Sequence, residues 1–197
     1  MITNQIIEDL EKIYHDKPHR LLHVYGVRDT AINLGITYDL DVHKIEVAAL
    51  LHDITKYENS DVHKNIIQSY FDNAEEILTD YNPNLWHAFS AVAIANTKYQ
   101  IDDPIILGMI QHHTIGKENM NLYEAILFIS DYTEPGRKYD SSIKVREILK
   151  KDLTLAVFTA MDDSIKLYTK LGHNIPSAAY QARTFYKQKL EVQNEKN

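Results

Sequence analysis

Apolar residues recur at intervals of three and four positions along most of the chain, which is the spacing of one face of an α-helix. No segment alternates apolar and polar residues between turn signals, as a half-buried strand would. The pattern therefore predicts an all-α fold, a helical bundle. The expected helices cover residues 3–15, 19–35, 42–55, 60–70, 83–98, 103–113, 121–133, 140–171 with a break near Lys151, and 176–192.

Local signals mark several of the expected helix ends. Asn82-Pro83 and Asp103-Pro104 each place a capping side chain before a proline, which is favoured in the first turn of a helix. Glycines, which commonly end helices, stand at positions 35, 116, 136 and 172. Because no repeat, linker or shift in composition divides the chain, we expect residues 1–197 to form a single domain.

The composition narrows the classes of protein to which the chain can belong. It has no cysteine, so disulfides, thiolate nucleophiles and iron–sulfur clusters are excluded. The net charge is −7, and no run rich in lysine or arginine precedes the C-terminal tail, which argues against a nucleic-acid polymer as partner. No apolar run approaches the roughly 18 residues of a membrane span, and the N-terminal segment lacks the pattern of a signal peptide. We therefore expect a cytoplasmic protein that does not bind a membrane.

Six titratable residues stand on otherwise apolar helix faces, judged by the three- and four-residue spacing of helix neighbours. They are His23, His52, Asp53, His87, His113 and Asp131. Taken singly, each is more often a core histidine satisfied by a hydrogen bond, or an aspartate that caps a helix. Taken together, two buried carboxylates with few lysines or arginines on the same faces need a partner. Imidazole and carboxylate ligands suit iron, manganese, cobalt or zinc, so the set predicts a metal site.

The other histidines give a weaker signal. Those at positions 15, 19, 43, 63 and 173 stand at expected helix ends or beside polar residues, and we expect them on the surface. His112 and His113 are about 100° apart on a helix, so only one of them is expected to face the centre. His113 has the more apolar face. Motifs for a phosphate-binding loop, a serine-hydrolase elbow and the HExxH zinc site are absent.

The order of the six residues, together with the segments around them, resembles a known family. The order is that of the HD superfamily of metal-dependent phosphohydrolases. The flanking segments resemble its YqeK group, the bacterial symmetrical bis(5′-nucleosyl)-tetraphosphatases, over roughly residues 15–185. The segments are RLLHVYGV (20–27), AALLHDITKY (48–57), LWHAFSAVAIA (85–95), HHTIGKENM (112–120) and, most specific of all, ISDYTEPGRKYD (129–140).

The resemblance implies an HD fold with two metal ions, most commonly iron, with manganese or cobalt as alternatives. It implies hydrolysis of diadenosine tetraphosphate to two ADP, and a homodimer. Residues His23, His52, Asp53 and Asp131 would bind one ion, and His87 and His113, with Asp53 bridging, would bind the second. Two positions depart from the pattern: Ala88 replaces an expected glycine, and His112 replaces an expected aromatic residue, which leaves the choice between His112 and His113 open.

Several further residues are candidates for contact with the substrate or for catalysis. Lys56 lies one turn after His52, Arg20 lies one turn before His23, and Arg137 lies in a loop after Asp131. Each of these cations can therefore reach a phosphate. The alternative for each is a solvated side chain on the surface. We expect Asp53 and Lys56 to act in catalysis. The remaining candidates are Thr114 and Gly116, which can also form an ordinary helix C-terminal turn, and Tyr132 and Tyr139, which can stack on a base or pack in the core.

Three functions stay open at this point. The function that the resemblance implies is hydrolysis of a dinucleoside polyphosphate. Two divalent ions would carry more charge than two carboxylates and make the pocket cationic, which suits such an anionic substrate. The first alternative is another HD phosphohydrolase that acts on nucleoside mono- or triphosphates or on guanosine alarmones. The second is a metal- and nucleotide-binding sensor without turnover, against which the intact set of ligand positions counts.

Overall fold

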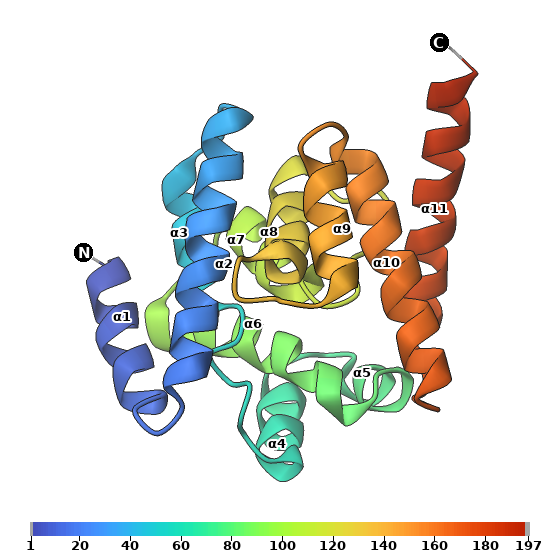
Figure 1. Ribbon diagram of the computed structural model, residues 1–197. Coiled ribbons are helices and arrows are strands. Elements are labelled where there is room, and N and C mark those ends of the chain that lie inside the picture. Colours follow the sequence, from blue (N-terminus) through green and yellow to red (C-terminus); the bar gives the residue numbers. More distant parts are fainter. Residues whose placement is uncertain (1, 196–197) are drawn as a thin grey trace.

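The computed structural model describes residues 2–195, and every regular element in that part of the chain is helical (Figure 1). The all-α prediction is therefore confirmed. Among the same residues, no helix is both long enough and apolar enough to cross a membrane. The elements are α1 (Ile2–Ile13), α2 (Pro18–Thr37), α3 (Val42–Leu51), α4 (Ser60–Tyr70), α5 (Ala74–Asp80), the 3-10 helix η1 (Pro83–Leu85), α6 (Trp86–Tyr99), α7 (Pro104–His112), α8 (Leu122–Thr133), α9 (Asp140–Leu149), α10 (Leu153–Lys170) and α11 (Ser177–Asn194).

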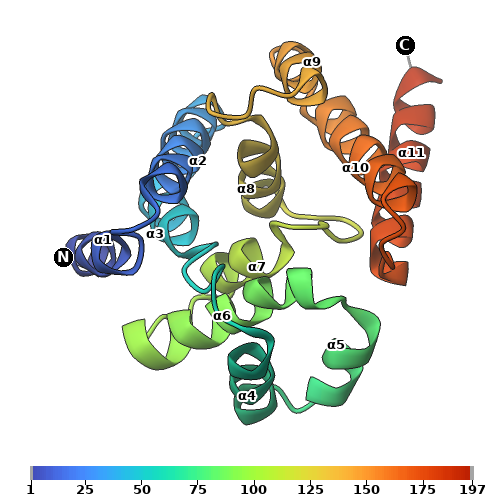
Figure 2. The same ribbon diagram turned by 60° about the horizontal axis from the view of Figure 1, so that its bottom comes forward.

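Helix α8 lies between two groups of helices (Figure 2). Helices α2 and α3 pack on one side of it, and α9 and α10 pack on the other, with α11 against the outer side of α10. Helix α7 contacts α3, α6 and α8, and α6 also packs against α4. Helix α8 therefore has neighbours from both halves of the chain, and its position is fixed from two directions.

The apolar core consists of three clusters, and α8 contributes to two of them. Ile126 and Leu127 belong to the cluster made with α1, α2, α3, α6 and α7. Phe128 and Ile129 belong to the cluster made with α9, α10 and α11. The third cluster joins α4, α5 and α6. Because burial of a large apolar side chain stabilises by about 1.5–3 kcal/mol, these four residues hold the end of α8 in place, and Asp131 lies two positions after Ile129.

Several predicted helix ends are confirmed by their capping contacts. The side chain of Asn82 accepts a hydrogen bond from the backbone of η1, and that of Asp103 accepts one from the backbone of α7. The predicted break near Lys151 lies between α9 and α10, where Asp152 caps α10. Gly116 and Gly172 have φ values of +69° and +74°, a conformation that favours glycine.

Two predicted boundaries are wrong, and one helix was missed. The helix expected over residues 42–55 ends at Leu51, and turns follow as far as residue 57. The short helix α5 was not predicted, because seven residues give too little periodicity. Gly35 does not end α2, which continues to Thr37. A Cβ atom at Gly35 would lie 2.4 Å from Ile45 Cδ1, so this glycine permits the close approach of α3 to α2.

The prediction of a surface position for His63 is also wrong. The side chain is buried, and its Nδ1 atom lies 2.6 Å from the Ser90 hydroxyl on α6. Burial, together with the charge of Lys56, lowers the pKa of His63. The contact joins α4 to α6. The polar neighbours of His63 in the sequence concealed this role, because its partner lies 27 positions away.

Glu124 is the acidic member of a capping box at the start of α8, and it is almost fully buried. Its carboxylate accepts hydrogen bonds from the backbone N–H of Asn121 at 2.8 Å and from His112 Nδ1 at 3.0 Å, and Lys117 Nζ lies 2.8 Å away. Burial alone would raise the pKa of Glu124, but the contacts with His112 and Lys117 lower it to about 2.

We predict that Glu124→Gln lowers the free energy of unfolding by about 1–3 kcal/mol at neutral pH, because the ionised form is the one that these partners stabilise. The pKa is depressed in the folded state, so the contribution is present above pH 4.5 and is lost as the pH falls towards about 2. Urea unfolding of both proteins at a series of pH values measures the difference. The difference in unfolding free energy between the unchanged protein and Glu124→Gln should narrow below pH 4.5. The exposed control Glu118→Gln should differ little from the unchanged protein. A difference for Glu124→Gln that stays constant with pH contradicts the prediction.

Candidate metal centre

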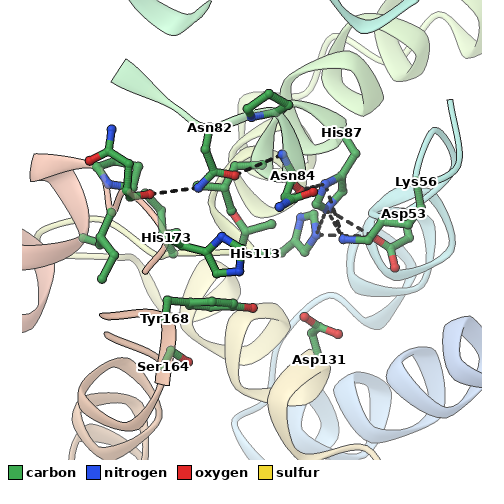
Figure 3. A pocket seen from close by; sticks show the side chains of 18 of the residues that line it. Asp53, Lys56, Asn82, Asn84, His87, His113, Asp131, Ser164, Tyr168 and His173 are labelled. Carbon is green, nitrogen blue, oxygen red and sulfur yellow. Dashed lines mark hydrogen bonds and ion pairs between the residues drawn. The ribbon is translucent and has the colours of Figure 1, made fainter. Parts of the chain in front are cut away.

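The structure brings the six predicted residues together, although they come from five segments of the chain. His23 lies in α2, the pair His52 and Asp53 follows α3, and His87 lies in the first turn of α6. His113 directly follows α7, and Asp131 lies in the last turn of α8. Figure 3 shows four of them, Asp53, His87, His113 and Asp131, around one cavity.

The two carboxylate oxygens of Asp53 face different pairs of histidines. Oδ2 lies 3.5 Å from His52 Nε2 and 3.7 Å from His23 Nε2. Oδ1 lies 3.2 Å from His87 Nε2 and 3.7 Å from His113 Nε2. Asp53 therefore stands between two sets of imidazole nitrogens.

Within residues 2–195, two sets of three ligand atoms lie close enough to hold a metal ion. The first set consists of His23, His52 and Asp131, and the second of His52, Asp53 and His113; within each set the atoms lie within 4.8 Å of one another. In the first set, His23 Nε2 is 3.1 Å from Asp131 Oδ1. His87 belongs to neither set, but its Nε2 atom is 3.2 Å from His113 Nε2.

Three of the histidines are oriented by the same local contact. In each, Nδ1 lies close to the backbone carbonyl oxygen three residues earlier, at 2.6 Å in His52, 2.8 Å in His87 and 2.7 Å in His113. A carbonyl oxygen can only accept, so Nδ1 carries the proton and donates. The Nε2 lone pair is then directed at the cluster, which is the tautomer that binds a metal.

His23 is oriented by a carboxylate that the sequence analysis did not single out. Its Nδ1 atom lies 3.2 Å from Glu134 Oε1, and Glu134 is buried. Glu134 also accepts a hydrogen bond from the backbone N–H of Gly136 at 2.5 Å. A Cβ atom at Gly26 would lie 2.6 Å from Glu134 Oε2, so the glycine leaves room for the carboxylate. The acidic residue in the DYTEPGR segment was the available signal.

These residues fit a divalent metal ion. Among the described residues, the buried Nε2 atoms of His23 and His52 have no hydrogen-bond partner, although carboxylate oxygens lie nearby. A buried polar atom without a partner is unfavourable, and a metal ion would satisfy both. Imidazole nitrogen and carboxylate oxygen are ligands for first-row divalent metals. The carboxylate and carbonyl contacts to the Nδ1 atoms are the outer partners that metal-binding histidines commonly have.

The charges of the cluster favour ionised aspartates and neutral histidines on the side of His87. Burial alone would raise the pKa of both aspartates, but nearby groups hold them well below the usual range: His52 and Lys56 act on Asp53, and His23 and Arg137 act on Asp131. Burial lowers the pKa of His87 to about 4 and also lowers that of His113. Both imidazoles are therefore neutral at pH 7.

The two predicted phosphate-binding arginines contact the aspartates. Arg20 Nη1 donates to Asp53 Oδ2 at 2.7 Å, and Arg137 Nη2 donates to Asp131 Oδ1 at 2.8 Å. Lys56 lies closer to the imidazole side of the cluster, with Nζ 3.1 Å from His87 Nε2 and 3.9 Å from Asp53 Oδ1. All three cations line the cavity of Figure 3.

The other predicted substrate residues divide into two groups. Thr114 lines the cavity. Gly116 does not; it turns the chain beside Met161. Tyr132 lines no described cavity and packs against the cluster formed by α8 to α11. Of His112 and His113, His113 lies at the cluster, whereas His112 pairs with Glu124.

The cavity has a volume of about 480 Å³ and extends from the cluster to the turn between α10 and α11. This size lies within the range of small-molecule sites. Figure 3 shows Tyr168 and His173 on the side opposite Asp53 and Lys56. The wall thus combines charged groups at one end with the aromatic side chains of Tyr168 and His173 at the other, and Asn84 lies next to His87 of the cluster.

Comparisons with known proteins agree with this arrangement. The sequence pattern of the HD domain family matches residues 20–136. A protein of Bacillus subtilis is 32% identical over 77% of this chain and 81% of its own length, and one of Halalkalibacterium halodurans is 33% identical over 82% and 85%. Both are named "Bis(5′-nucleosyl)-tetraphosphatase, symmetrical".

A solved structure supports the same relationship. It is a crystal structure from Clostridium acetobutylicum described as a "predicted HD superfamily hydrolase involved in NAD metabolism". It superposes with a TM-score of 0.87 and 29% sequence identity, and the match covers 94% of this chain and 97% of the other. The family pattern spans more than half of the chain and contains all six residues of the cluster. The chain therefore belongs to the HD domain family and is related, within it, to proteins named symmetrical bis(5′-nucleosyl)-tetraphosphatase.

Proposed function

We propose that the protein is an enzyme that hydrolyses diadenosine tetraphosphate symmetrically, so that one substrate molecule and one water give two ADP. The observation that carries this proposal is the position of Asp53, whose two oxygens face separate histidine pairs at one end of a cavity lined with cations. The names of the related proteins supply the substrate.

We further propose two metal ions in the cluster. His23, His52, Asp53 and Asp131 would bind one, and His87 and His113 would bind the other. Asp53 would bridge them, since a carboxylate has two oxygens and an imidazole only one free lone pair. Iron is the metal that the family resemblance implies, and manganese and cobalt suit the same ligands. Such ions lower the pKa of a bound water and neutralise charge on phosphoryl oxygens.

The chain's own cations would orient the ligands and the substrate. Arg20 and Arg137 pair with the two carboxylates and would fix their rotation through the contacts at 2.7 Å and 2.8 Å. Lys56 has a side chain about one-third exposed, so its ammonium group can contact a phosphate at the cavity wall while remaining near Asp53. Thr114 completes this wall. The homodimer implied by the family resemblance stays a prediction, which analytical ultracentrifugation tests.

The first prediction concerns the products. Purified protein supplied with Mn²⁺ or Fe²⁺ should convert diadenosine tetraphosphate to ADP alone, as measured by anion-exchange chromatography. AMP together with ATP would indicate an asymmetrical cut and refute the proposal. Inactivity on this substrate, with hydrolysis of nucleoside monophosphates, triphosphates or guanosine alarmones, would identify another HD phosphohydrolase. Nucleotide binding without any turnover would identify a sensor.

The second prediction concerns Asp53. We expect Asp53→Asn to reduce bound metal and to lower kcat/KM by more than about 100-fold. Loss of a residue that only hydrogen-bonds to a metal ligand typically lowers metal affinity or activity by about 10–100-fold, and Asp53 is itself a proposed ligand. Elemental analysis and the product assay measure the two effects, and circular dichroism checks that the fold is retained. Asp102→Asn, an exposed site, is the matched control. Undiminished hydrolysis by metal-depleted Asp53→Asn would exclude the proposed role.

The third prediction concerns Glu134. Glu134→Gln keeps the shape of the side chain but removes the charge that makes the His23 imidazole a stronger ligand. We expect the apparent affinity for Mn²⁺ to fall by about 10–100-fold, while kcat at saturating metal changes little. Titration of activity and calorimetry with Mn²⁺ alone measure this affinity. If Glu134→Gln and the exposed control Glu118→Gln bind Mn²⁺ equally well, Glu134 does not orient a ligand.

A further inference from the structure

A second cavity lies next to the cluster, bordered by α2 and the loop after α8. It has a volume of about 890 Å³. His23 lines it, although His23 does not line the cavity of Figure 3. It is also lined by Asn33 of α2, by Lys138 and Tyr139 of the loop, and by the carboxylates of Asp29 and Glu134. Hydroxyl, amide, cationic and aromatic groups are thus available in a cavity to which the proposed function has assigned no part of the substrate.

The two cavities share two lining residues, both of them arginines. Arg20 and Arg137 line both cavities. Asp53 and Asp131, which these arginines contact, line only the first cavity, and His23 lines only the second. The cluster therefore lies at the boundary between the two cavities and not at the closed end of one.

The chemistry of a symmetrical cut requires such a central position. Hydrolysis of the middle anhydride bond of diadenosine tetraphosphate leaves two phosphates on each nucleoside. The reacting phosphorus is therefore near the middle of the substrate, and the two nucleosides extend from it in different directions. A site with a cavity on one side only would enclose one half of the molecule and leave the other half in solvent.

We propose that the two nucleoside halves of the substrate bind in the two cavities, one on each side of the cluster, with Arg20 and Arg137 beside the tetraphosphate where it passes between them. This inference rests on the proposed function. It assigns to Tyr168 contact with the base in the first cavity and to Tyr139 contact with the base in the second.

The two tyrosines suit this role by position and exposure. Tyr168 lies beside His173, with ring centroids 5.8 Å apart in an edge-to-face arrangement, at the end of the first cavity away from Asp53. Tyr139 immediately precedes α9 at the rim of the second cavity. Their exposed fractions are 48% and 67%, so each ring has a free surface on which a base can stack. Lys138, next to Tyr139, adds positive charge near the phosphates of that half.

The test compares two substrates that differ by one nucleoside. Diadenosine tetraphosphate has two, and adenosine 5′-tetraphosphate has one; the analogous cut of the latter with one water gives ADP and pyrophosphate. The variants are Tyr168→Ala and Tyr139→Ala, with Tyr168→Phe and Tyr139→Phe to retain the rings. Tyr180→Ala is the matched control, since Tyr180 is 46% exposed and lines neither cavity.

We expect each alanine replacement to raise the KM for diadenosine tetraphosphate roughly five-fold or more, the effect of losing one base–aromatic stack. The phenylalanine and Tyr180 variants should match the unchanged protein. Adenosine 5′-tetraphosphate, which fills one cavity, should respond to only one of the two alanine replacements.

Two results would overturn the inference while the proposed function stands: an unchanged KM for diadenosine tetraphosphate in Tyr139→Ala or Tyr168→Ala, or the same response of both substrates to both replacements. Failure of the unchanged protein to form ADP from diadenosine tetraphosphate would instead refute the proposed function. The two failures are therefore distinguishable.

Discussion

The buried carboxylate of Asp53 is the constraint on which the site depends. An ionised carboxylate taken out of water is unfavourable by several kcal/mol unless it is paired and hydrogen-bonded. Here Arg20 donates to one oxygen, four imidazoles surround both, and the Tyr14 hydroxyl donates to the backbone carbonyl of the same residue. These partners come from the segments after α1, α3 and α7 and from helices α2 and α6, so their packing converges on one residue.

The position of α8 follows from a second constraint of the same kind. Asp131, whose side chain is only partly exposed, lies close to His23 and Arg137, and these neighbours hold its pKa well below the usual range. The apolar residues before it anchor α8 in two clusters on opposite sides, and its first turn is held by the buried Glu124. The packing thus places the backbone of Asp131, and Arg137 of the following loop contacts its carboxylate.

The sequence predicted the all-α fold and the residues that converge, because both leave periodic signals along the chain. A polar side chain on an apolar helix face is visible at three- and four-residue spacing. Contacts between distant segments leave no such signal. Glu134 lies 111 positions from His23, and His63 lies 27 positions from Ser90. The pairing of Arg20 with Asp53 likewise depends on how α2 meets the turn after α3, which no local pattern specifies. The same applies to Tyr132, whose neighbours in the core come from other helices.

The pairing of arginines with aspartates also explains how a chain of net charge −7 can present a site to a polyanion. Arg20 and Arg137 balance the charges of Asp53 and Asp131, and Lys56 adds one positive charge at the cavity wall. Burial keeps His87 and His113 neutral. The carboxylates are therefore already compensated before any ion binds, so the charge of bound divalent ions would act almost undiminished on phosphate oxygens. Were the arginines absent, two carboxylates would cancel the charge of one such ion. By neutralising the aspartates, the arginines would favour phosphate binding even without contacting the phosphate. Their contacts with the aspartates therefore agree with the phosphate chemistry that the family resemblance implies.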